Sequence, residues 1–67
     1  MRKVVNEELR DTIRTMCAYG INYYEIVNTS NDMIVAVSRE REQATKICEE
    51  YNNKFYTTEF KVNFINN

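Results

Sequence analysis

The chain contains few residues that could do chemistry. It has no His, so the commonest general base and the commonest metal ligand of proteins are both missing. Glu49 and Glu50 are neighbours on a predicted helix, where adjacent side chains diverge by roughly 100°, so they cannot share a proton. Glu7 and Asp11 share a helical face, but solvated helix surfaces commonly carry such charges. The sequence therefore predicts a protein that is not an enzyme and that binds no metal or cofactor.

The two cysteines do not form a recognisable metal or redox motif. Cys17 and Cys48 lie 31 positions apart without a second pair, which excludes a zinc ribbon and a C-x-x-C motif. Both fall on the apolar stripes of predicted helices. Because free Cys is among the most buried residue types, we expect two buried, reduced thiols. A disulfide between them would require the two helices to face each other closely, and the sequence leaves this open.

Length and composition describe one small globular domain, which we place at residues 1–67. Hydrophobic residues make up 43% and charged residues 28%, an ordinary globular balance. The net charge of -1 creates no general attraction to nucleic acid or to membranes. No stretch approaches the roughly 18 apolar residues of a membrane span, and the N-terminus lacks the apolar core of a signal peptide. We therefore expect a cytoplasmic protein with no membrane partner.

The N-terminal half predicts one helix and a β-hairpin. Residues 6–19 carry apolar side chains at helical spacing behind Asn6, a good N-cap. Gly20 follows where a left-handed C-terminal cap is favoured. Residues 22–27 and 33–37 are rich in strand-forming residues and flank a stretch of turn-forming ones.

The C-terminal half predicts a second helix and a third strand. Ser38 is the expected N-cap of a helix that runs to about Asn52. Residues 56–65 then alternate between apolar and polar side chains, which turns one row toward the core. The inward row is Phe60, Val62 and Phe64.

The expected fold class is α+β, with a three-stranded β-sheet and two α-helices in the order α-β-β-α-β. The third strand could pair with the first strand, which makes the sheet fully antiparallel. It could also pair with the second strand through a right-handed crossover. Both strand orders remain open.

Tyrosines and one apolar strand indicate protein binding. The five tyrosines exceed what so small a core can bury with satisfied hydroxyls, and Tyr is enriched at interface hot spots. Residues 33–37 are all apolar, yet successive side chains point to opposite faces of a sheet. Either Ile34 and Ala36 face the helices, or the other three residues do. The expected partner-binding residues are Tyr23, Tyr24, Met33, Val35 and Val37.

The second apolar face of this sheet would need a cover. One solution is a homodimer formed through the open sheet face or through an edge strand. The other is an N-terminal helix packed on that face, which would make the monomer a three-layer structure.

A small nucleic-acid-associated regulator is the alternative function. Basic residues gather in the N-terminal helix region, and tyrosines can stack on unpaired bases. However, acidic residues are interleaved with the basic ones, and the isoelectric point near 5.3 is well below the range typical of nucleic-acid-binding domains. The basic residues concerned are Arg2, Lys3, Arg10 and Arg14.

Over residues 23–64 the spacing of core residues and caps resembles a ββαβ module of small uncharacterised proteins from bacteriophages and mobile elements. The matching residues are Tyr23, Ile26, Val27, Val35, Ala36, Ser38, Ala44, Ile47, Cys48, Tyr51, Asn52, Phe60 and Val62. The nine Asn residues and the use of Lys, Ile and Tyr fit an AT-rich phage genome. Such proteins are often inhibitors of a host enzyme or defence complex, as anti-CRISPR proteins are. The resemblance implies a host or defence protein as partner, in the host cell cytoplasm, and supplies no site residues.

Overall fold

The computed structural model describes residues 2–67 and confirms an α+β fold with two helices. Its elements are β1 (Lys3–Val4), α1 (Glu7–Ala18), β2 (Tyr23–Asn28), β3 (Met33–Ser38), α2 (Arg41–Lys54) and β4 (Phe60–Ile65). The expected sheet of three strands is wrong, because β1 adds a fourth. A two-residue strand is too short to produce an alternating pattern, and it exists only through its pairing with β3.

The sheet has the strand order β1-β3-β2-β4, with β2 in the centre. Strand β2 pairs antiparallel with β3 on one side and with β4 on the other. Of the two strand orders left open, the structure therefore adopts the one in which the last strand pairs with the first strand of the hairpin. Only the short pair of β1 with β3 is parallel.

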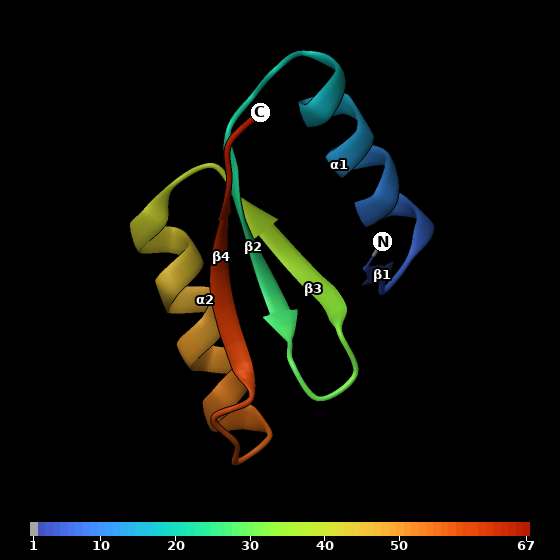
Figure 1. Ribbon diagram of the computed structural model, residues 1–67. Helices are drawn as coiled ribbons and strands as arrows, with labels where there is room; N and C mark the ends of the chain where they lie inside the picture. The colour runs from blue at the N-terminus through green and yellow to red at the C-terminus, as the bar shows by residue number, and fades with distance from the viewer. Residues whose placement is uncertain (1) are drawn as a thin grey trace.

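The sheet lies between the two helices, as Figure 1 shows. On one face, α2 supplies Ala44 and Cys48 to a core cluster with Ile26 and Phe60. On the other face, α1 packs against β1 and β3 and buries Met16. Two-residue alternation along β2 separates the two faces, because Tyr23 and Val27 point away from the α2 side and are buried too.

The apolar strand β3 fits both faces through a β-bulge. Ile26 pairs with Ala36, but the next residue of β2 pairs with Ile34, so Val35 is an extra residue in β3. Val35 and Ala36 both pack against the α2 cluster, while Ile34 and Val37 share the α1 face. The expectation of strict alternation is therefore wrong, and no open apolar sheet face remains over β3, because α1 covers it.

The helix boundaries match the expectations in part. Asn6 is the N-cap of α1 and accepts a hydrogen bond from the Leu9 amide at 2.8 Å. The second helix begins at Arg41 with Glu40 as its N-cap, so Ser38 is not the cap as expected. Its hydroxyl instead accepts a hydrogen bond from the Glu40 amide in the preceding turn. No helix within residues 2–67 is long and apolar enough to span a membrane.

The two cysteines are both free, but only Cys48 is buried. The expectation that Cys17 is buried as well is wrong. Cys17 lies one position after Met16, and the helix turns Met16 rather than Cys17 toward the sheet.

We predict that Phe60 and Phe64 differ sharply in their contribution to stability, although both lie on the α2 face of β4. Phe60 is 5% exposed and Phe64 is 49% exposed. Phe60→Ala should lower the free energy of unfolding by about 3–5 kcal/mol, the usual range for a buried Phe. Phe64→Ala should lower it by only about 1 kcal/mol. Urea titrations of both variants measure this difference, and equal losses would contradict the assigned core.

Candidate protein-binding edge

Strand β4 forms an edge of the sheet, with β2 on one side and no strand on the other. The amide of Thr29 donates to the carbonyl of Glu59 at 3.1 Å, just beyond the end of the β2–β4 ladder. In an antiparallel ladder the main-chain groups of alternate residues point to opposite sides. Odd-numbered residues of β4 therefore bond to β2, and the main-chain groups of Phe60, Val62 and Phe64 point outward.

The side chain of Asn52 forms hydrogen bonds with the outward amide and carbonyl of Phe60. The Phe60 amide donates to Asn52 Oδ1 at 3.0 Å, and Asn52 Nδ2 donates to the Phe60 carbonyl at 3.1 Å. The Cys48 thiol donates to the same carbonyl at 3.1 Å, and burial raises the pKa of this thiol. Within residues 2–67 the outward main-chain groups of Val62 and Phe64 have no partner.

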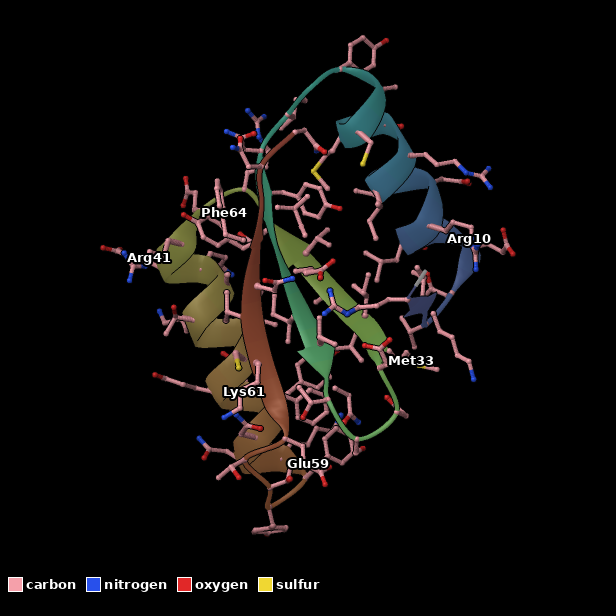
Figure 2. All side chains as sticks on the ribbon, viewed as in Figure 1. Arg10, Met33, Arg41, Glu59, Lys61 and Phe64 are labelled. Carbon is pink, nitrogen blue, oxygen red and sulfur yellow. The ribbon has the colours of Figure 1, made fainter. Side chains whose placement is uncertain are left out.

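A groove runs beside these free main-chain groups. It has a volume of about 410 Å³ and lies between β4 and the first turns of α2. The ring of Phe64 packs against the ring of Tyr24, with the two ring centroids 5.0 Å apart and an angle of 47° between the ring planes. Figure 2 shows Phe64 next to Arg41 on the α2 side of the sheet. The lining residues are Tyr24, Arg41, Thr45, Val62 and Phe64. We call the free groups of Val62 and Phe64, together with this groove, the β4 edge site.

The opposite face of the same strands carries a buried carboxylate. Glu25 in β2 is 3% exposed, and it forms an ion pair with Arg2. Asn63 of β4 donates to Glu25 Oε1 at 2.9 Å, and Arg2 Nε also donates to Asp32 at 2.9 Å. The charge of Glu25 is thus paired and hydrogen-bonded, and this cluster holds β2 and β4 together with the N-terminal segment.

The five residues expected to bind a partner do not share one surface. Tyr23 and Val37 lie on the α1 face, and Tyr23 is 4% exposed. Burial raises the pKa of Tyr23 to about 12, and the neighbouring Cys17 adds to the shift. Tyr24 and Val35 pack against the α2 cluster, and the pairing of Met33 with Asn28 places Met33 on that same face. Of the five, only Tyr24 lines the β4 edge site.

The four basic residues of the alternative function are not equivalent in the structure. The guanidinium of Arg2 is engaged by Glu25 and Asp32. Lys3 lies in β1, while Arg10 and Arg14 lie on α1, and Figure 2 shows Arg10 on the outer side of that helix. Arg2 therefore has a structural role in ion pairs, whereas Lys3, Arg10 and Arg14 form no ion pair among residues 2–67.

Sequence reasoning missed Arg41 and Thr45 as members of the site, and it placed Phe64 only in the core. The alternation of residues 56–65 did identify the face that Val62 and Phe64 present. What it lacked was the strand order, because only an edge strand has free main-chain groups.

A second unusual feature lies at the end of α2, where Tyr56 is 96% exposed and has a left-handed backbone, with φ of 51°. The amide of Tyr56 bonds to the carbonyl of Asn53, and that of Thr57 bonds to Asn52. This is the Schellman motif, which favours Gly at the left-handed position. Helix α1 ends in the same motif and has Gly20 there, with φ of 67°. Tyr56 thus occupies a strained position without being buried.

No group of three or more potential metal ligands occurs within residues 2–67. The chain matches no protein-family model, and comparisons with curated proteins and with solved structures find no significant similarity.

We predict that Tyr56→Gly stabilises the protein by about 1 kcal/mol, because Gly adopts the left-handed conformation without the steric cost of a Cβ atom. The matched control is Tyr19→Gly. Tyr19 is also an exposed Tyr at a helix end, but its φ is -95°. This control should be neutral or destabilising, because Gly gains flexibility in the unfolded chain. Thermal melts measure the stability of both variants. If Tyr56→Gly is less stable than the wild type, the assigned backbone strain at Tyr56 is wrong.

We also predict that stability falls as the pH rises from 10 to 12, partly because of Tyr23. Its pKa is 10.0 in the unfolded chain and about 12 in the folded protein. In this interval the unfolded state loses the phenol proton first, so unfolding becomes more favourable. Tyr23→Phe should make the decline less steep in urea titrations across this pH range. Tyr56→Phe, at an exposed position, is the control, and an equal effect of the two changes would contradict the assignment.

Proposed function

We propose that this chain is a non-catalytic protein-binding module that takes up an extended segment of another protein by β-strand addition along β4. The observation that carries the proposal is that the amides and carbonyls of Val62 and Phe64 are free, beside a groove for a side chain. In β-strand addition, main-chain hydrogen bonds supply affinity and pockets for alternate side chains supply specificity. The β4 edge site provides both.

The site also indicates the chemistry of the added segment. Side chains that point toward α2 would enter the groove against Tyr24 and Phe64, so apolar residues are favoured there. Arg41 lines the same groove and has no acidic partner within ion-pair distance among residues 2–67. An acidic residue two positions from the apolar one, on the same face of the added strand, would therefore be favoured by charge.

Strand β4 lacks most of the devices that protect an edge. It contains no Pro, and its one charged residue, Lys61, is on the face opposite the groove. Natural proteins usually block long free edges with charges, bulges or Pro, or cover them. Only the first residue of β4 is covered, through Asn52. An accessible edge of this kind supports a binding role.

The resemblance to small phage and mobile-element proteins makes a host or defence protein the proposed partner, in an anti-CRISPR-like role. The alternative of a nucleic-acid-associated regulator has less support, because Arg2 is already paired with two carboxylates. Lys3 lies in β1, at the opposite edge of the sheet from β4, and Arg10 and Arg14 lie on α1, which packs against β1 and β3.

The test uses random 12-residue peptides displayed and selected on the protein, followed by affinity measurements with synthetic copies of the selected peptides. Phe64→Pro removes an amide that faces solvent, so it should leave the fold intact. We predict that it weakens peptide binding at least tenfold. The matched control is Phe64→Ala, which loses the ring but keeps the amide, and should weaken binding less.

Circular dichroism establishes that both variants are folded before binding is measured. Selected peptides should share an apolar residue that alternates with other residues, and they should protect the Val62 and Phe64 amides from hydrogen exchange. Failure to select any peptide would contradict the proposal. So would peptides that bind Phe64→Pro as tightly as the wild type.

A further inference from the structure

We propose that the β4 edge site, when free of another protein, binds the β4 strand of a second copy of this chain, in one defined antiparallel register centred on Asn63. The inference rests on the proposed function, because both use the same edge. It adds a specific occupant and predicts that self-association and partner binding compete.

The register follows from which main-chain groups are free. A two-fold axis perpendicular to the sheet pairs each residue with one at an equal distance on the other side of the centre. Centred on Val62, the pairing would need the main chain of Phe60 to bond to Phe64 of the second copy. Phe60 is already bonded to Asn52 at both its amide and its carbonyl, so this register breaks existing bonds.

Centred on Asn63, the hydrogen-bonded pairs within β4 use only free groups, because Phe60 then lies opposite Asn66, beyond the end of β4. Val62 of each copy faces Phe64 of the other, and each such pair exchanges two main-chain hydrogen bonds. A centre at Phe64 would instead place the partner of Val62 beyond Ile65, where β4 ends. The Asn63 register is thus the one that satisfies the free edge within β4.

The side chains are also self-complementary in this register. On the α2 face, the half-exposed ring of Phe64 meets Val62 of the second copy, and both lie at the groove. On the other face, the two Asn63 amides meet each other, and Lys61 lies opposite Ile65. No like charges stand directly opposite, which would be destabilising in a strand pair. The net charge of -1 per chain adds little repulsion.

The resulting dimer has a continuous sheet with twice the number of strands, and the two α2 helices lie on the same face of it. The two β4 strands pair at the centre of this sheet. A two-fold axis perpendicular to the sheet keeps the α2 face of both copies on the same side. A short strand pair buries little surface, so the association should be weak and depend on concentration. An extended segment of another protein with a better groove residue would then displace the second copy.

Disulfide trapping tests the register directly. In the Asn63 register the two copies of residue 63 form a non-hydrogen-bonded pair, with Cα atoms about 4.5 Å apart, which suits a disulfide. Asn63→Cys in a Cys17→Ser background should therefore give a covalent dimer under mild oxidation. The matched control is Lys61→Cys in the same background, whose two copies would be separated by roughly 13 Å along the strands, so it should stay monomeric.

Asn63→Cys loses the hydrogen bond to Glu25, which can destabilise the fold. A second variant therefore tests the same register with Asn63 unchanged. Lys61→Cys combined with Ile65→Cys should also crosslink, because these two positions face each other between copies. Sedimentation of the wild type at increasing micromolar concentration should show a monomer–dimer equilibrium, and Phe64→Pro should abolish it. A wild type that stays monomeric, or a Lys61→Cys variant that crosslinks as well as Asn63→Cys, would overturn the inference.

The outcomes separate this inference from the proposed function. If the wild type stays monomeric while Phe64→Pro still weakens peptide binding, self-pairing is wrong and the binding function stands. If the dimer forms in this register but no selected peptide displaces it, self-pairing stands and the binding function is wrong.

Discussion

The pairing of the Asn52 side chain with the main chain of Phe60 is the interaction on which the rest of this structure depends. One edge of a primary amide presents an N–H donor beside a carbonyl acceptor, as the N–H and C=O of a single strand residue do, so Asn52 takes the place of a neighbouring strand residue. It ties α2 to the start of β4, and this brings Cys48 and Phe60 together in the core cluster. It also defines where the free edge begins, because the groups beyond Phe60 have no such partner.

The opposite face of the sheet is closed by different means. Helix α1 covers β1 and β3, and the long side chain of Arg2 reaches Glu25 in the central strand. A buried carboxylate without a partner would be strongly destabilising, so Arg2 and Asn63 are needed where they are. With α2 on one face and α1 over β1 and β3 on the other, we place the proposed binding surface at the β4 edge of the sheet rather than on a face. This is why the proposed interaction surface differs from the apolar strand face that the sequence favours.

Local features of the fold could be predicted from the sequence, and long-range ones could not. Asn6 and Gly20 mark the ends of α1 through local hydrogen bonds and backbone preference, so their roles are readable along the chain. The extra residue Val35 reverses the facing of part of β3 and depends on the exact register of the pairing with β2, which the turn residues do not fix. The edge position of β4 and the role of Asn52 likewise depend on strand order, which loop lengths and periodicity leave open. Tyr56 shows that even a local feature can escape prediction, because residue preferences favour Gly or Asn, not Tyr, at a left-handed position.

The central claim is that β4 has free main-chain groups only beyond the residue that Asn52 closes. Amide hydrogen exchange, measured by NMR at a concentration low enough to keep the protein monomeric, tests it most directly. The amides of Val62 and Phe64 should exchange at nearly unprotected rates. The amides of Phe60, which donates to Asn52, and of Lys61 and Asn63, which face β2, should exchange slowly. Slow exchange at Val62 and Phe64 in the monomer, equal to that of their neighbours, would contradict the account.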